Sequence, residues 1–179
     1  MALITLTDAR TIRRISANYD TNEFNPFVNE IQIFYLSPLL GVDLYNDLVA
    51  NPTDAQNVIL LDGEDYTYGS RTYTFKGVKK YLSYLFFYKY SVEGQVKYTD
   101  SGRQNFEVDF ATKSQKGIDA QVINNFIDKA KLIGEETRLF LERNSTDYPL
   151  YESGEASDLP NKDFKFNVVG NTYIKPRVQ

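Results

Sequence analysis

The sequence predicts a mainly α-helical fold: a helical bundle built on one long helix in the C-terminal half, with one or two small β-hairpins and an extended C-terminal arm. Apolar residues recur at helical spacing over residues 114–144 and again over residues 77–93. Short stretches that alternate with period two flank glycine-containing turns. The 179 residues suffice for one domain with a core. We expect that domain over residues 1–151 and an arm over residues 152–179.

Composition favours contact over catalysis. The chain has 14 Tyr and 12 Phe but neither His nor Cys, so the side chains best suited to proton transfer, nucleophilic attack and transition-metal binding are missing. The lack of Cys suits assembly in a reducing cytoplasm. A net charge of −4 opposes general affinity for nucleic acid. We therefore expect no enzyme activity, no cofactor and no metal, and neither a membrane span nor a signal peptide.

Four cap signals predict short helices in the first third of the chain. The expected starts are Thr7, Asn25-Pro26, Ser37-Pro38 and Thr53. A kink is expected near Ser37, and Asn51-Pro52 is expected to end the run that follows it.

A hairpin with a defined register is expected next. Gly69-Ser70 is a suitable two-residue loop. The expected pairs are Tyr68 with Arg71, Thr67 with Thr72 and Tyr66 with Tyr73. One face then carries tyrosines and Phe75 while the other carries threonines, so a slip of one residue would bury threonine.

The helix expected over residues 77–93 is apolar on two sides. Its first stripe consists of Val78, Tyr81, Leu82, Leu85 and Val92. Its second row consists of Tyr84, Phe87 and Tyr90. A helix of this kind is buried on both sides, so the second row is covered either by the chain's other helices or by another subunit. We predict these three aromatic residues as interface residues.

The second half of the chain combines a strand, a long helix and the arm. Phe106, Val108 and Phe110 alternate with acidic residues, which is typical of a strand. The long helix has one apolar face and ends before Asp147-Tyr148-Pro149. That face consists of Ile118, Val122, Phe126, Ala130, Ile133, Thr137 and Leu141.

The arm has a linker composition at first and then a strand pattern that includes a turn at Gly170-Asn171. Its predicted interface residues are Phe164, Phe166, Val168 and Tyr173. An isolated hairpin is marginally stable at best. We therefore expect the arm to form a hairpin or an added strand that docks on a sheet edge or groove, either of a neighbour or of its own domain.

Charged clusters offer weaker hypotheses. Asp62, Glu64 and Asp65 form the densest acidic group, and a carboxylate hydrolase would need such residues, although solvation in a loop is their ordinary explanation. Two basic groups fit either solvated helix faces or contacts to phosphate or an acidic partner. They consist of Arg10, Arg13 and Arg14, and of Lys76, Lys79 and Lys80.

Several segments together resemble the head-to-tail connector proteins (adaptor, or head-completion, proteins) of tailed phages, especially crAss-like and other phages that infect Bacteroidales. The order and spacing of the segments, from about Ile4 to Tyr151, carry the resemblance. They are Asn25-Pro26-Phe27-Val28 with Ile31-Gln32, Leu39-Leu40-Gly41-Val42-Asp43-Leu44-Tyr45, Tyr73-Thr74-Phe75-Lys76-Gly77-Val78 with Tyr81-Leu82-Ser83-Tyr84-Leu85-Phe86-Phe87-Tyr88, and Phe140-Leu141-Glu142-Arg143-Asn144 with Tyr148-Pro149-Leu150-Tyr151.

The resemblance implies a structural virion protein without catalytic residues. Its subunits would form a homo-oligomeric ring, a dodecamer, in the neck between capsid and tail. The ring would bind the portal protein and the next tail or ring protein. Genomic DNA would pass through its channel during packaging and ejection without specific binding. The arm does not align with that family. The alternatives are another neck or tail component, such as a second ring protein or a tail terminator, and a nucleic-acid-binding module.

Overall fold

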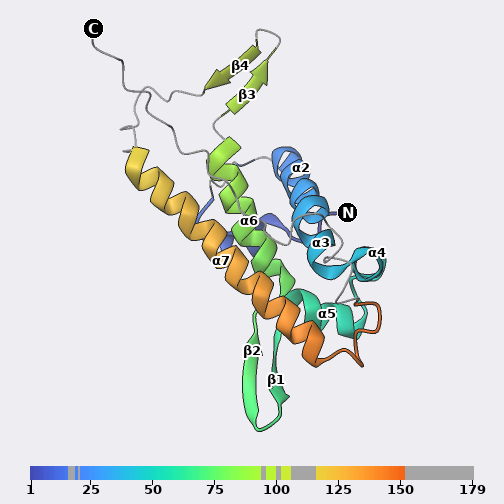
Figure 1. Cartoon of the computed structure of the whole chain (residues 1–179). Coiled ribbons are helices and arrows are strands. Elements are labelled where there is room, and N and C mark those ends of the chain that lie inside the picture. The colour runs from blue at the N-terminus through green and yellow to red at the C-terminus, as the bar shows by residue number, and fades with distance from the viewer. Residues whose placement is uncertain (16–18, 20, 94–95, 100–101, 106–115, 152–179) are drawn as a thin grey trace, which may run out of the picture.

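The computed structural model confirms a mainly helical fold (Figure 1). It describes residues 1–15, 19, 21–93, 96–99, 102–105 and 116–151. The helices are α1 (Leu6–Arg10), α2 (Thr21–Ile31), the π-helix η1 (Gln32–Leu36), α3 (Ser37–Leu40), α4 (Val42–Ala50), α5 (Ala55–Asp62), α6 (Val78–Glu93) and α7 (Lys116–Arg143). The strands are β1 (Glu64–Tyr68), β2 (Arg71–Phe75), β3 (Val96–Thr99) and β4 (Gly102–Asn105). The strand predicted over residues 106–110 and the arm lie outside the described residues.

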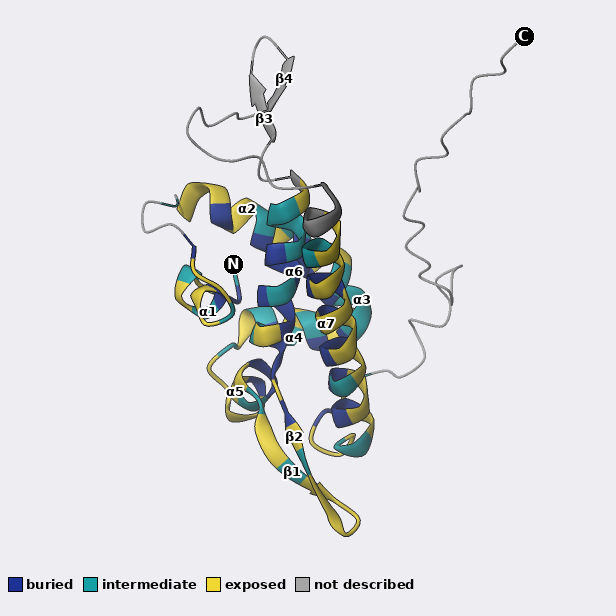
Figure 2. Ribbon diagram, turned by 90° about the vertical axis from the view of Figure 1, so that its left-hand side faces the viewer, coloured by how far each residue is buried: buried dark blue, intermediate teal, exposed yellow. Residues whose placement is uncertain are grey.

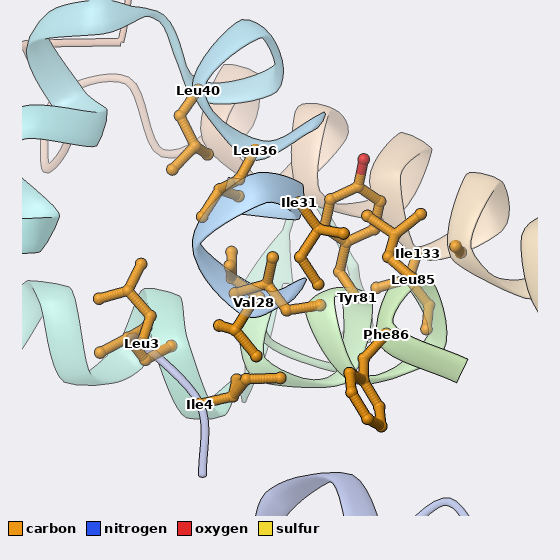
Figure 3. Packing of buried hydrophobic residues seen from close by; sticks show 14 of the residues in the cluster. Leu3, Ile4, Val28, Ile31, Leu36, Leu40, Tyr81, Leu85, Phe86 and Ile133 are labelled. Atoms are coloured by element: carbon orange, nitrogen blue, oxygen red, sulfur yellow. The ribbon is translucent and has the colours of Figure 1, made fainter. Parts of the chain in front are cut away.

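Helix α6 lies at the centre of the molecule. It contacts α7 along one side and α1, α2 and α5 elsewhere (Figures 1 and 2). Figure 3 shows side chains from the N-terminal segment, α2, η1, α3, α6 and α7 pointing into one apolar cluster. Because neighbours surround α6, its apolar residues occupy more than one face, as its sequence predicts.

The predicted first face of α6 is mostly confirmed. Val78, Tyr81, Leu82 and Leu85 are buried. Val92, seven residues after Leu85 on the same side of the helix, is 49% exposed, so the buried part of the stripe ends before it.

Helix α7 confirms the long predicted helix and five of the seven residues of its apolar face; Val122 is half-buried, and the side chain of Ile118 lies outside the described part of the structure. Its inward side consists of Phe126, Ala130, Ile133, Thr137 and Leu141. The Thr137 hydroxyl donates to the carbonyl oxygen of Ile133 one turn earlier, at 2.8 Å. This bond satisfies the polar group of a fully buried side chain within the helix itself.

Three predicted helix starts are wrong by one to five residues. Thr5, not Thr7, caps α1 in a reciprocal capping box with Asp8. Asp54, not Thr53, occupies the N-cap position of α5. Helix α2 begins at Thr21, so Pro26 lies inside it rather than at its start.

The early start of α2 follows from a ring contact. Phe24 is buried and packs on Phe86 of α6, with ring centroids 4.6 Å apart. This tertiary contact stabilises a turn ahead of the proline. Pro26 lacks an N–H, so the helix loses one backbone bond there.

Near Ser37-Pro38, where the sequence predicts a kink, the structure has a π-helical turn. η1 ends at Leu36 and α3 follows directly, with Pro38 in its first turn. The N–H of Ser37 donates to the carbonyl oxygen of Gln32, five residues earlier. A proline that lacks a donor and crowds the preceding turn favours such a shift of the hydrogen-bond ladder.

The predicted register of the first hairpin is confirmed. Tyr66 pairs with Tyr73, Thr67 with Thr72 and Tyr68 with Arg71. The hairpin projects beyond the helical body (Figures 1 and 2). Its base is held by Phe75, whose ring stacks on Phe140 of α7 with centroids 4.2 Å apart.

Candidate interaction surfaces

The second aromatic row of α6 is covered by the chain's own elements. Phe87 is 5% exposed and stacks on Phe126 of α7, with centroids 5.4 Å apart. Of the two coverings that the sequence leaves open, the structure therefore shows the chain's own helices. The ring of Phe87 therefore contacts its own domain, and little of it is left for contact with a partner.

Tyr84 and Tyr90 are partly covered. The ring of Tyr90 lies edge-on to Tyr19 at 5.4 Å between centroids. Lys129 of α7 places its Nζ 5.7 Å from the Tyr84 centroid. Both side chains stay half-buried, so their role as interface residues remains a prediction. The other predicted contacts, Phe164, Phe166, Val168 and Tyr173, lie outside the described residues.

The π-helical turn presents an apolar pair to solvent. Ile33 and Phe34 are both exposed, Phe34 by 63%. A π-helical turn shifts the residues that follow it relative to α-helical spacing. The next residue, Tyr35, is half-buried and packs against the core. We call Ile33 and Phe34 the η1 patch.

A second exposed apolar pair lies on α7. Leu132 is 65% exposed, and Leu139 stands seven residues later. Seven residues make about two helical turns, so the two side chains share one side of the helix. We call them the α7 patch. Periodicity alone could have revealed it, because both leucines fall off the core stripe.

A groove separates α7 from η1 and α3. Its volume is about 170 Å³ and its walls are largely apolar. The lining residues are Tyr35, Leu39, Tyr81, Leu85, Ile127, Ala130, Lys131, Gly134 and Glu135. Gly134 lets α7 approach α6 closely, because a Cβ there would lie 3.3 Å from the ring of Tyr81.

The charged clusters make contacts within the domain. Asp62 pairs with Lys79 at 2.6 Å, and Asp65 accepts a hydrogen bond from Thr74 at 2.6 Å. Lys76 pairs with Glu136 of α7. These contacts hold the base of the hairpin against α6 and α7. Across the residues that the structure describes, no group of three or more acidic side chains is placed to hold a metal ion.

The first basic cluster is also partly engaged. The guanidinium of Arg13 lies over the ring of Phe126, 5.1 Å from its centroid. Arg14 and Lys80 are exposed.

Arg143 at the end of α7 holds the hairpin through its tyrosine face. Its Nη1 donates to the hydroxyl of Tyr66 at 2.9 Å. Its guanidinium carbon lies 4.3 Å from the Tyr73 centroid and 5.0 Å from the Tyr68 centroid. The hydrogen bond to Tyr66 raises the pKa of Arg143 above its usual value. The tyrosine face predicted from alternation therefore packs on an arginine, and its Tyr66 ring also lies edge-on to Phe140 with centroids 5.1 Å apart.

These features define the class of protein: a mainly helical domain with a projecting hairpin and exposed pairs of large apolar side chains on η1 and on α7. None of its described helices is long and apolar enough to cross a lipid bilayer.

The chain belongs to a family of unknown function, DUF6712, whose model matches residues 36–161, more than half of the sequence. That stretch contains α3 to α7, the hairpin and the α7 patch. Comparison with curated proteins and with solved structures gave no match.

Proposed function

We propose that this protein is a structural virion protein, a subunit of a head-to-tail connector ring that docks beneath the portal and joins capsid to tail. In that role it contacts copies of itself, the portal protein and the next tail or ring protein. It would act in the neck of the particle after assembly in the host cytoplasm.

The two exposed apolar patches carry the proposal. A ring requires a heterologous interface, in which two different surfaces of the subunit meet around a closing rotation. The η1 patch and the α7 patch are different surfaces on different elements, and each exposes large side chains. Pairing the patch of one copy with the other patch of the next would bury both.

The resemblance to connector proteins supports the same role. Among the segments that resemble connector proteins, Leu39–Tyr45 forms the junction of α3 and α4, where Gly41 adopts a φ of +79°. The hairpin segment leads directly into α6, and the last segment contains the end of α7. The segments that resemble the family therefore pack into one helical body.

The charge of the chain supports a channel through which DNA passes without being bound. The net charge of −4 gives the subunit no general attraction to phosphate. Lys76 and Lys79 pair with acidic side chains of the same chain. A channel through which DNA slides benefits from such weak affinity.

Native mass spectrometry of the chain alone and mixed with its portal protein tests the proposal. We expect a ring of twelve copies on the portal. Leu132→Asp and Phe34→Asp should each prevent ring formation, because a charge would be buried in the interface. Val58→Asp is the matched control, since Val58 is exposed on α5 outside both patches.

Circular dichroism should show that all three variants keep their helical content. A chain that forms no ring with or without the portal would contradict the proposal. So would rings that tolerate both patch substitutions.

A further inference from the structure

We propose that the groove between α7 and the η1–α3 segment is the docking site for the chain's own C-terminal arm, and that an aromatic side chain of residues 164–168 fills it. This inference does not depend on ring formation. It assigns an occupant to a surface that neither apolar patch includes.

The groove has the size and chemistry of an aromatic site. Its volume of about 170 Å³ compares with the roughly 150 Å³ of an apolar cavity that holds one benzene ring. Tyr35, Tyr81 and Leu85 provide apolar walls, and Ile127 and Ala130 continue them on α7. One phenyl ring would therefore fill most of the groove.

The described chain ends on a path toward this groove. After α7 the backbone turns at residues 144–150, and the Tyr148 hydroxyl fixes the turn by donating to the carbonyl oxygen of Gln56 at 2.9 Å. Tyr151 then packs against the apolar cluster. Burial raises the pKa of Tyr151, and the nearby charges of Glu142, Arg138 and Glu135 also act on it. Tyr151 thus lies against the side of α7 that carries these residues.

That side of α7 continues into the groove. Glu135 also lines the groove, and Lys131 stands one turn before it. The chain therefore leaves the described domain on the stripe of α7 that forms the groove's rim.

The arm is long enough to reach the groove. Glu142 and Ile127 are about 22 Å apart along the helix axis, at roughly 1.5 Å per residue. Residues 152–163 span up to about 40 Å when extended. The tether therefore permits docking within one chain, and it raises the local concentration of the arm to the millimolar range.

The arm's sequence matches the groove in polarity. In an extended segment Phe164, Phe166 and Val168 share one side. Asp163 and Lys165 flank Phe164, while Lys131 and Glu135 stand at the groove's α7 side.

Disulfide trapping tests this assignment, because the full chain contains no Cys of its own. The test variant carries Lys131→Cys and Lys165→Cys, which leaves Phe164 and Phe166 intact. The control carries Asn125→Cys and Lys165→Cys. Asn125 is an exposed α7 residue that lines a separate hollow with Arg13 and Tyr84, away from the groove. Non-reducing electrophoresis and intact mass follow oxidation at dilute concentration.

We expect an intramolecular disulfide that forms roughly tenfold faster in the test variant than in the control, since both share the same tether. Adding Phe164→Ser and Phe166→Ser should lower the test rate to the control rate. Equal rates for both cysteine pairs would overturn the proposal, as would a test rate unchanged by the serine substitutions. A product that links two chains would instead assign the groove to a neighbour's arm and also overturn it. Because the readout needs no portal, failure of the ring proposal leaves the result interpretable.

Discussion

Gly63 and Gly77 pack against each other where the hairpin joins the helical body. Gly63 has a φ of +86° and Gly77 a φ of +80°, a region that favours glycine. A Cβ on Gly63 would lie 2.3 Å from the carbonyl oxygen of Phe75. A Cβ on Gly77 would lie 2.5 Å from the carbonyl oxygen of Leu61. Each glycine therefore meets the backbone of the other segment.

Gly63→Ala and Gly77→Ala should each lower the free energy of unfolding by about 2–5 kcal/mol, because strain of the positive φ adds to overlap with backbone atoms. Urea denaturation measures the change. Gly41→Ala is the control: its φ is +79°, but a Cβ there has nothing within 4 Å. It should cost only about 1–2 kcal/mol. Equal losses of unfolding free energy at all three positions would show that the close backbone contact between Gly63 and Gly77 adds nothing to the cost.

A buried asparagine links α4 to α5. The Nδ2 of Asn57 donates to Asp47 Oδ2 at 2.9 Å and to the carbonyl oxygen of Asn51 at 3.0 Å. Hydrogen bonds from Asn57 and Asn51 lower the pKa of Asp47 in the folded chain. The unfolded state therefore binds the proton more readily. The lowered pKa of Asp47 therefore stabilises the folded chain at pH values above about 4, which is the pKa of this carboxyl in the unfolded chain. This stabilisation is lost as the pH falls through the lower pKa of Asp47 in the folded chain.

Asn57→Ala should cost about 1–3 kcal/mol of unfolding free energy at pH 7, because it leaves the Asn51 carbonyl without this donor and removes a partner of Asp47. The cost should shrink at pH 3, where Asp47 begins to take up its proton. Urea titrations of both proteins at the two pH values give the comparison. An identical cost at both would contradict the role assigned to the Asp47 carboxylate.

At the scale of elements, the packing of α6 on α7 buries Phe87 of the aromatic row. Phe87→Ala should destabilise the isolated chain by about 3–5 kcal/mol, because it opens a cavity against Phe126. Val92→Ala, on the same helix but exposed, should change stability by less than about 0.5 kcal/mol. Thermal unfolding of dilute protein provides the measurement. A Phe87→Ala chain as stable as the parent would contradict the internal packing of Phe87 and favour its assignment as an interface residue.

The elements with strong local patterns were predictable from the sequence. The hairpin register follows from a two-residue loop and strict alternation, and the inward face of α7 follows from helical periodicity. The start of α2 was not predictable in this way, because Phe24 gains its contact with Phe86 only in the folded chain. The covering of Phe87 likewise depends on α7, more than 20 residues away in sequence.

The two apolar patches also differ in how far the sequence predicts them. The α7 patch follows from a helical projection of residues 116–143, whereas the η1 patch depends on a π-helical turn that an α-helical pattern does not encode. Gln32 opens that turn. It is buried and binds the N-terminal segment, accepting from the N–H of Leu3 at 2.6 Å and donating to the carbonyl oxygen of Met1 at 3.0 Å. Only the folded structure brings these segments together.

At the scale of the whole molecule, the domain buries Phe87 of the aromatic row and leaves the η1 patch and the α7 patch exposed. Self-association in the proposed ring therefore depends on a few side chains rather than on the aromatic helix. Residues at the centre of such an interface dominate its energy, so substitutions at Phe34 and Leu132 should outweigh those at Tyr84 and Tyr90. Ring yield on the portal, compared between Phe34→Asp and Tyr90→Asp, measures this order. A larger loss for Tyr90→Asp would assign the interface to α6.

A reconstruction of the chain bound to its portal protein tests the central claim most directly. The account predicts a closed ring in which Leu132 and Leu139 of each copy lie against Ile33 and Phe34 of the next. A ring whose subunits leave both patches in solvent, or a neck that contains no ring of this chain, would contradict it.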